Sequence, residues 1–405
     1  MFTEFRRLLA GTTSTAVVAG LVVTGAVVGS VATTAPAAAD VPTPGDTQSV
    51  ITVKVGGDRS GVQGVTALQG VQLQLWDGGD SGPTGPTTVD TGHSTTCTSD
   101  AQGDCSFVIY NTGSSSPNDA NRNKRFWIKR TGSPTGWFGL DALRVGTQGP
   151  PAWPLADYQF RTGDTLTGGN TYRSTSNFMI ATGLSNNVAS GGIWQTSRNN
   201  PSFPAQCGID VALVIDLSNS VSADELTELK TAVNTFVRAL QGTPSRVALY
   251  TFATNAPADG STNITRALTP VSTAAGVTTV QGYVNGLVLP GGDDGGTNWD
   301  RGIAQVAQSG ESYDAAIVLT DGNPTFYNDP AQGPGGRTRF RELENGIFSA
   351  NAVKAENTKM IAFGVGDDVS GDPANLQAIS GPLVNDDYFQ AADYLAAGDK
   401  LALRI

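Results

Sequence analysis

Charged side chains are scarce in this 405-residue chain, and the balance among them is acidic. They make up 15% of the residues, where an ordinary globular domain has about a quarter. The formal net charge is -11 at pH 7, and no basic face is visible in the sequence. Such a surface repels phosphate backbones, which excludes nucleic acid as a partner and makes cations the expected ligands.

Histidine is almost absent, and this restricts the reactions open to the protein. The one histidine, His93, lies in a Thr- and Ser-rich stretch and is interpreted as an exposed turn residue. A Ser-His-Asp arrangement in the C-terminal half is excluded, and the chain contains neither a GxSxG turn nor a Walker-type loop. We therefore expect a protein that is not an enzyme.

Apolar runs long enough to cross a membrane are lacking beyond the N-terminus. At the N-terminus, Arg6 and Arg7 precede the run TAVVAGLVVTGAVVGSVA, and the small residues APAAA end at Ala39. This pattern predicts a secretory signal over residues 1–39, followed by a short linker over 40–47. An uncleaved anchor is the alternative, but the Gly and Thr in the run and the Ala-x-Ala site favour cleavage. The mature protein is therefore expected to be exported and to have no membrane span.

Cysteine is limited to three residues. Cys97 and Cys105 bracket the turn-rich stretch TSDAQGD, whose ends a hairpin would bring together. Because exported thiols seldom stay reduced, we predict a disulfide between them, with two buried thiols as the alternative. Cys207 is then left over, and it is either free or paired with sequence beyond Ile405.

Glutamate is missing altogether from residues 48–185, a region that alternates in a β manner. The stretches VITVKV, GVQLQLW and CSFVIY are separated by turns rich in Gly, Pro, Asn and Asp, without helical periodicity. The pattern predicts a β-sandwich over 48–185. Residues 186–206 are polar and contain proline, which is typical of a linker.

From residue 207 to 405, strands alternate with helices. VALVIDL at 211–217 is an apolar strand of the kind buried on both faces of a parallel sheet, and ADELTELKTAVNTFVRALQ follows with helical spacing. Ser222 and Glu225 form a capping-box pattern where that helix begins. Further strands are expected at RVALYTF, AAIVLTD, MIAFGVG and DYFQ, and further helices near 273–286, at NWDRGIAQVAQ, near 338–357 and at DYLAAGDKLALRI. The alternation predicts a doubly wound α/β domain over 207–405.

Oxygen-bearing side chains follow the ends of these strands. In an open parallel sheet such ends meet at one edge, where neighbouring connections run to opposite faces. Two carboxylates and three hydroxyls are hard oxygen ligands, which suit Mg²⁺, with Mn²⁺ or Ca²⁺ as alternatives. The predicted metal ligands are Asp216, Ser218, Ser220, Thr297 and Asp321.

Each element of this set also has a simpler interpretation. A DxSxS stretch is commonly a helix-capping turn, and TDG is commonly a strand-end turn. A scaffold whose carboxylates only cap helices is therefore the alternative to a metal site. Asp293 and Asp294 lie in a Gly-rich loop that we interpret as solvated, and they are left out of the site.

Together, the five residues resemble the metal-ion-dependent adhesion site of the von Willebrand factor A family, whose fold is also called the integrin I-domain fold. The resemblance implies that Ser218 and Ser220 coordinate directly and that Asp216 and Asp321 do so directly or through water. It also implies that Thr297 switches between the two modes as ligand binds. Family members with an intact site usually bind proteins, so a partner's acidic side chain is expected to complete the coordination.

The N-terminal region carries a weaker resemblance. GVQLQLWDGG followed by CTSDAQGDCSFVIY is similar to the prealbumin-like, or collagen-adhesin B-type, modules of Gram-positive surface proteins and pilins. Such modules often contain a Lys-Asn isopeptide, for which Lys54, Asn177 and the acid Asp157 are the candidates here. Because Lys54 faces away from the apolar side of its strand and Glu is missing, an ordinary solvated Lys54 is favoured.

These features predict a secreted, cell-surface adhesin associated with the cell wall or a pilus of a Gram-positive, actinobacterial organism. Its expected partners are an extracellular protein or host matrix ligand, bound through the cation, and other pilus or surface subunits. A structural pilus or stalk subunit with a vestigial metal site is the alternative, and a metal-dependent hydrolase is less favoured. Surface proteins of this kind usually continue, so the chain is expected to be truncated at Ile405.

Overall fold

The computed structural model describes residues 40–88, 94–114, 120–147, 153–180, 188–366, 369 and 373–404. The predicted signal at 1–39 and the turn residue His93 lie outside these ranges. Within them, no helix is both long and apolar enough to cross a membrane.

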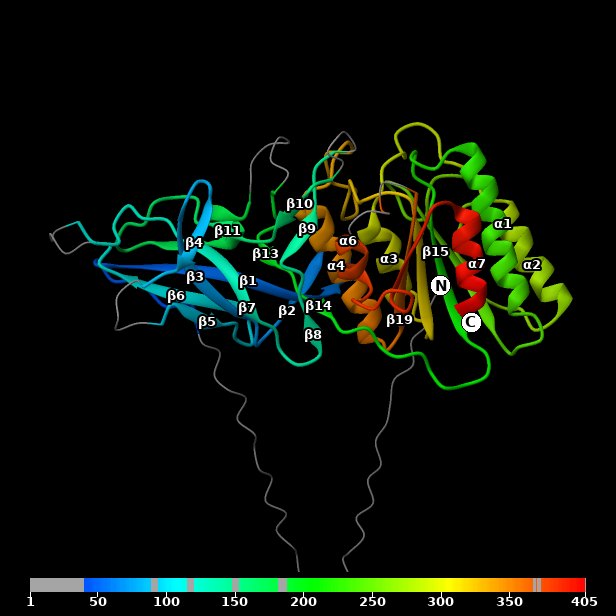
Figure 1. The fold of residues 1–405 in the computed structure, drawn as a ribbon, viewed down its shortest axis with the longest axis horizontal. Coiled ribbons are helices and arrows are strands. Elements are labelled where there is room, and N and C mark those ends of the chain that lie inside the picture. Colours follow the sequence, from blue (N-terminus) through cyan, green and yellow to red (C-terminus); the bar gives the residue numbers. More distant parts are fainter. Residues whose placement is uncertain are drawn as a thin grey trace, which may run out of the picture. The chain divides into compact units, whose positions relative to one another are not determined.

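The N-terminal part is all β, as the alternation predicts, and consists mainly of two sheets (Figure 1). In the first sheet, β1 (Gln48–Ser60) pairs with β2 (Gly64–Ala67), β6 (Asp104–Tyr110), β12 (Thr171–Arg173) and β13 (Ile193–Trp194). The second sheet has the order β11-β7-β3-β4, and β5 pairs with β3. Its strands are β3 (Gln72–Gly79), β4 (Gly82–Pro86), β5 (Thr96–Thr98), β7 (Trp127–Gly132) and β11 (Phe160–Arg161). Short pairs join β8 (Trp137–Phe138) to β14 (Ser197–Arg198) and β9 (Ala142–Arg144) to β10 (Leu155–Asp157), and a π-helical turn spans Ser174–Phe178.

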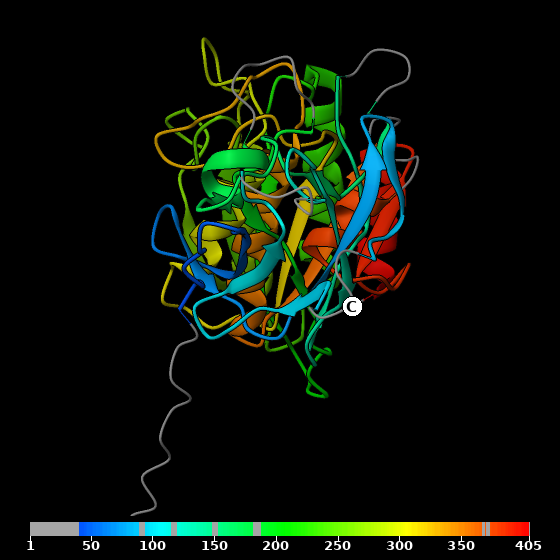
Figure 2. The ribbon, with the colours of Figure 1, turned by 90° about the vertical axis from the view of Figure 1, so that its left-hand side faces the viewer.

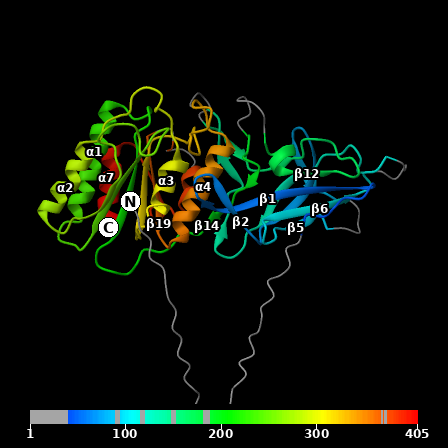
Figure 3. The same ribbon diagram turned by 180° about the vertical axis from the view of Figure 1, so that it is seen from behind.

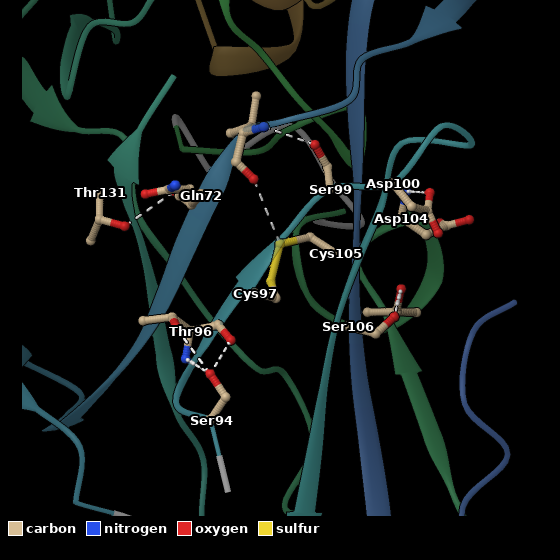
Figure 4. Close-up of a disulfide and its surroundings, with 12 residues drawn as sticks. Gln72, Ser94, Thr96, Cys97, Ser99, Asp100, Asp104, Cys105, Ser106 and Thr131 are labelled. Atoms are coloured by element: carbon tan, nitrogen blue, oxygen red, sulfur yellow. Dashed lines mark hydrogen bonds between the residues drawn. A yellow bond between two sulfur atoms is a disulfide. The ribbon is translucent and has the colours of Figure 1, made fainter. Parts of the chain in front are cut away.

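A disulfide links the two sheets, as predicted. Cys97 in β5 and Cys105 in β6 are bonded, with their Cα atoms 5.5 Å apart (Figure 4). The β6 strand alternates between buried and partly exposed residues, so Cys105 shares the buried face with Phe107 and Ile109. The bond is therefore part of the core between the sheets. Cys207 is exposed and unbonded.

The candidate isopeptide residues make ordinary polar contacts. Lys54 Nζ forms a partly exposed ion pair with Asp104 Oδ2 at 3.2 Å. The side-chain oxygen of Asn177 accepts a hydrogen bond from the backbone N–H of Arg173 at 2.8 Å.

The C-terminal part is a doubly wound α/β domain, as predicted, built on a six-stranded sheet of order β17-β16-β15-β18-β19-β20. All neighbours pair in parallel except β17, which is antiparallel to β16. The strands are β15 (Asp210–Asp216), β16 (Arg246–Phe252), β17 (Arg266–Pro270), β18 (Ala315–Thr320), β19 (Lys359–Val365) and β20 (Tyr388–Ala391). The helices are α1 (Ala223–Ala239), α2 (Ala274–Asn285), α3 (Trp299–Ala307), α4 (Phe340–Ala355), α6 (Ala374–Ile379) and α7 (Tyr394–Arg404).

Each face of this sheet contributes to a different core. In the central strand β15, Val211, Leu213 and Ile215 pack with α1, α2 and α7, whereas Ala212 and Val214 point to the side of α3, α4 and α6. The two-residue period of a strand produces this division, and it explains why the strand is apolar throughout. Figure 3 shows the two helix layers from behind, with α1 and α2 on one side of the sheet and α3 and α4 on the other.

The β strands pack against the outer side of α4, so that α4 lies between them and the sheet (Figure 1). Figure 2 turns the side of the β strands toward the viewer. Apolar residues of both regions, such as Phe160 and Phe340, belong to one buried cluster. The segment interpreted as a linker contributes to this packing, because its residues form β13 and β14, which pair with β1 and β8. Each of these strands has two residues, too few for a periodic pattern to reveal them.

Candidate metal centre

The predicted ligands lie at the carboxyl edge of the sheet. Strand β15 ends at Asp216, and Asp321 directly follows β18. The two strands are neighbours, but the chain leaves β15 for β16 on the other side, so this is the point where connections diverge. Ligand sites of open α/β sheets are found at such points.

Four of the five residues are joined by hydrogen bonds. The backbone N–H of Ser218 donates to Asp216 Oδ1 at 2.9 Å, and the hydroxyls of Ser218 and Ser220 are 2.9 Å apart. Ser220 Oγ then donates to Asp321 Oδ1 at 2.7 Å. Residues 216 to 220 therefore turn so that alternate side chains converge.

Thr297 lies close to the cluster and two residues before helix α3. Asn298 caps this helix by accepting from the N–H of Arg301, and the carbonyl of Thr297 accepts from the N–H groups of Thr325 and Phe326. A methyl group built on Gly322 would lie 3.4 Å from Ser220 Oγ and 3.8 Å from Thr297 Oγ1. The two hydroxyls thus flank one small space, which the absence of a side chain at 322 leaves open.

The two carboxylates are strongly desolvated. Burial raises the pKa of Asp216 to about 6, against the counteracting hydrogen bonds from Thr320 and Ser218. Burial and then the charge of Asp216 raise the pKa of Asp321 to about 8. Neither carboxylate has a hydrogen bond or ion pair with a lysine or arginine among the described residues. When the two carboxyl groups are ionised, no protein cation among the described residues balances their charge.

Residues 210–400 match the family model of the von Willebrand factor type A domain. This part of the chain is a von Willebrand factor type A domain. The fold agrees with the resemblance found in the sequence. No curated protein matches the chain.

Solved structures that resemble the chain cover about half of it. The pilus adhesin SpaC from Lactobacillus rhamnosus GG, in its open conformation, is 19% identical, with a TM-score of 0.39 over 52% of this chain and 30% of that one. The type V pili tip protein Mfa5 from Porphyromonas gingivalis is 14% identical in its vWF domain, with a TM-score of 0.36 over 49% of this chain and 95% of that one. A von Willebrand factor type A protein from Catenulispora acidiphila is 16% identical, with a TM-score of 0.34 over 51% and 43%. The chain spans less than a third of the length of the SpaC structure.

Two residues near the site of the A-type domain were not identified from the sequence. Thr320, the last residue of β18, donates from Oγ1 to Asp216 Oδ2 at 2.6 Å. Tyr394 at the start of α7 is fully buried, and its hydroxyl has no hydrogen-bond partner in the described part of the chain. Burial and then the charges of Asp321 and Asp216 raise the pKa of Tyr394. The position of Thr320 beside Asp321 is a usable signal, but that of Tyr394 depends on how α7 packs.

The donor set suits a divalent cation such as Mg²⁺. It consists of carboxylate and hydroxyl oxygens, the hard ligands that Mg²⁺ and Ca²⁺ prefer. Among the described residues, no three His, Cys, Asp or Glu side chains are grouped so that they could hold a metal ion; this cluster has two carboxylates, and its other donors are hydroxyls. A cation held between Asp216 and Asp321 would balance two buried negative charges that otherwise repel each other.

The Gly-rich loop before Thr297 is hydrogen-bonded to a neighbouring loop through Asp294. Asp294 is buried and accepts from the backbone N–H groups of Asn255 and Asp259 at 2.7 and 2.6 Å. Asp293 is exposed. Asp294 is thus committed to holding the neighbouring loop, which agrees with leaving both residues out of the predicted site.

Proposed function

We propose that the chain is an exported binding protein whose A-type domain holds a divalent cation and binds an acidic side chain of a protein partner through it. The single observation that supports this is the convergence of two unbalanced, buried carboxylates and three hydroxyls at the switch point of the sheet. The proposed ligands are Asp216, Ser218, Ser220, Thr297 and Asp321. The favoured ion is Mg²⁺, and Mn²⁺ or Ca²⁺ has the same ligand preference.

The proposed ligands act by holding the ion and orienting the groups around it. The two carboxylates match the charge of a divalent ion, and the other proposed ligands are neutral hydroxyls, so a bound ion would have coordination positions left for water or for a partner's oxygen. When bound, a divalent cation supplies a Lewis-acidic centre for a carboxylate oxygen. Thr320 donates a hydrogen bond to Asp216 and so orients its carboxylate, as residues that contact a metal ligand commonly do.

The residues around the oxygen cluster favour binding over catalysis. A pocket of about 260 Å³ opens beside it, lined by Trp, Asn, Ser, Thr and Gly residues. None of its lining residues is a histidine, lysine or cysteine, so a general acid or base other than the two carboxylates is not provided there. The surroundings suit recognition of a chain segment. Export is part of this proposal and rests on the N-terminal signal pattern. The proposed place on the cell surface or a pilus rests on the resemblance to surface and pilus adhesins.

Calorimetric titration with Mg²⁺ tests the metal site. The wild-type domain is expected to show saturable heat, Asp216→Ala and Asp321→Ala none, and Asp293→Asn the wild-type value because Asp293 is exposed and outside the site. Absence of saturable heat in the wild type would show a vestigial site and sink the proposal. Adhesion to a panel of immobilised matrix proteins and cell surfaces should be lost in EDTA and in Asp216→Ala; adhesion that survives both would mean that the ion is not the contact.

A further inference from the structure

One short segment joins two of the proposed metal ligands. Residues 322–328, which we call the rim segment, directly follow Asp321, and Asn323 and Thr325 within it line the pocket beside the oxygen cluster. The carbonyl of Thr297 accepts from the N–H of Thr325 at 2.8 Å, and the N–H of Thr297 donates to Thr325 Oγ1 at 3.1 Å. The position of the rim segment therefore affects both Asp321 and Thr297.

A buried asparagine of α6 joins the start of the rim segment to the β region. Helix α6 lies beside strand β9 (Figure 1). Asn375 in α6 accepts from the backbone N–H of Arg144 in β9 at 2.9 Å and donates to Arg144 O at 2.9 Å. Its Nδ2 atom also donates to Asn323 Oδ1 at 2.7 Å. Asn375 is 3% exposed, and one amide thus connects β9 with the residue two positions after Asp321.

The end of the rim segment is joined to the β region through a second buried side chain. The N–H of Asn328 donates to Asp300 Oδ2 at 2.8 Å, and Asp300 Oδ1 lies 2.6 Å from Nη2 of Arg59 at the end of β1. The carbonyl of Asn328 accepts from Asn298 Nδ2 at 3.2 Å, and Asn298 caps α3 directly after Thr297. The β region thus holds both ends of the rim segment, each through one intervening side chain.

The rim segment depends on such contacts for its position. It belongs to none of the helices or strands, so bonds to neighbouring elements fix its place. Mg²⁺ demands near-octahedral coordination at about 2.0–2.1 Å, and ligands that are already in place bind it more tightly than ligands that must be ordered first. Residues that hold metal ligands in position commonly change the metal affinity by about 10- to 100-fold.

We propose that Asn375 is a positioning residue for the metal site, through which the β region raises the affinity of the A-type domain for its divalent cation. The inference rests on the proposed function. Asn375 does not coordinate the ion; it fixes Asn323, and with it the backbone that follows Asp321, against β9. The β region is then part of the metal-binding unit and not only a neighbouring module.

The chain offers a closely matched control for this asparagine. Asn351 in α4 is also buried, accepts from the backbone N–H of Arg198 at 2.7 Å, and donates to Gly57 O and Thr196 O at 2.8 Å each. These are three hydrogen bonds of the same amide groups as in Asn375, and they also join a helix of the A-type domain to the preceding part of the chain. They do not reach the rim segment.

Asn375→Leu and Asn351→Leu separate positioning from general stability. Each replaces an amide by an apolar group of the same branched shape and removes three buried hydrogen bonds, so both should lower the unfolding temperature in EDTA. Calorimetric titration of the full chain with Mg²⁺, at a temperature where both variants are folded, should give a Kd about tenfold weaker for Asn375→Leu. Asn351→Leu should keep the wild-type Kd.

Asn323→Ala tests the same link from its other end and leaves the bonds between Asn375 and β9 in place. It should also weaken Mg²⁺ binding, and adding Asn375→Leu to it should weaken binding by less than about twofold more, because both changes break one bond. This variant decides the question if Asn375→Leu does not fold. Wild-type Mg²⁺ affinity in Asn375→Leu or in Asn323→Ala, or an equal loss in Asn351→Leu, would overturn the inference alone. A wild type without saturable Mg²⁺ heat would overturn the proposed function and the inference with it.

Discussion

Arg59 at the end of β1 reaches into the A-type domain and pairs with Asp300 in the first turn of α3. The Nη2 atom of Arg59 lies 2.6 Å from Asp300 Oδ1, and the two side chains are 2% and 0% exposed. The other carboxylate oxygen of Asp300 accepts from the backbone N–H of Asn328 at 2.8 Å. Since Thr297 lies two residues before α3, the β region is tied to the helix whose start follows a candidate metal ligand.

Arg59→Met should destabilise the protein strongly. It leaves the carboxylate of Asp300 buried without its cation, and breaking such a pair costs about 3–5 kcal/mol. Urea denaturation measures this as a lower midpoint. Arg246→Met is the control, because its pair with Asp210 is partly exposed and should contribute less than about 1 kcal/mol. The double variant Arg59→Met/Asp300→Asn should recover part of the loss, and equal stabilities of Arg59→Met and wild type would contradict the buried pair.

Mg²⁺ should stabilise the protein more at pH 8 than at pH 5.5. Because the pKa values of Asp216 and Asp321 are raised above the ordinary 3.8, the folded metal-free protein holds protons more tightly than the unfolded chain. The stability that these two groups contribute is fully present below about pH 4. It is lost as pH rises through the pKa of Asp216, about 6, and then through that of Asp321, about 8. Mg²⁺ requires the ionised carboxylates, so it restores stability where they have lost their protons.

Thermal unfolding with Mg²⁺ and with EDTA at both pH values checks this prediction. At roughly a thousandfold excess over Kd the gain at pH 8 should reach about 4 kcal/mol. Asp321→Asn should show no response to Mg²⁺ and a flatter pH dependence in EDTA. An equal Mg²⁺ effect at both pH values would show that the ion does not bind to these carboxylates.

Glu344→Gln should stabilise the protein at alkaline pH relative to wild type. Burial raises the pKa of Glu344 to about 7 from 4.5, although its oxygens accept from Tyr158 at 2.6 Å and Gly191 N at 2.7 Å. Its contribution to stability is therefore complete below about pH 4.5 and lost as pH rises through about 7. The difference between variant and wild type should shift by up to about 3 kcal/mol between pH 5 and pH 8.5, in favour of the variant.

Chemical denaturation across that pH range is the measurement for Glu344. Glu356→Gln, an exposed change just after the same helix, should leave the pH dependence of the wild type intact. Parallel curves for Glu344→Gln and wild type would show that Glu344 does not titrate in the folded protein.

Loss of the disulfide should cost about 2–3 kcal/mol. The bond closes a loop of eight residue steps, and chain-entropy estimates give this size for so short a loop. Cys97→Ala/Cys105→Ala should lower the urea midpoint accordingly. Cys207→Ala should have no effect, because Cys207 is exposed and unbonded. A double variant as stable as the wild type would mean that the sheets hold the loop without the bond.

Much of the A-type domain could be predicted because its signals are local. The strand and helix at 210–239 follow from an apolar run, a capping box at Ser222 and a helical period, all of which the structure contains. Convergence of Asp216 and Asp321 then follows from one rule of parallel sheets. Helix α4 was also predicted, but its environment was not. The β region buries polar residues of this helix that would face solvent in an isolated domain, namely Glu344, Asn345 and Ser349.

The sequence by itself thus determined the alternation of elements, the pairing of Cys97 with Cys105 and the oxygen set at the strand ends, since each depends on residues whose spacing the chain sets directly. Only the tertiary structure decided which surface of the A-type domain the β strands cover, and with it the partners of Arg59 and the place of Trp153 beside the pocket. The physical reason is that these contacts join residues far apart in the sequence, 241 positions in the case of Arg59 and Asp300, and their energies come from burial and complementary charge, which no periodicity encodes.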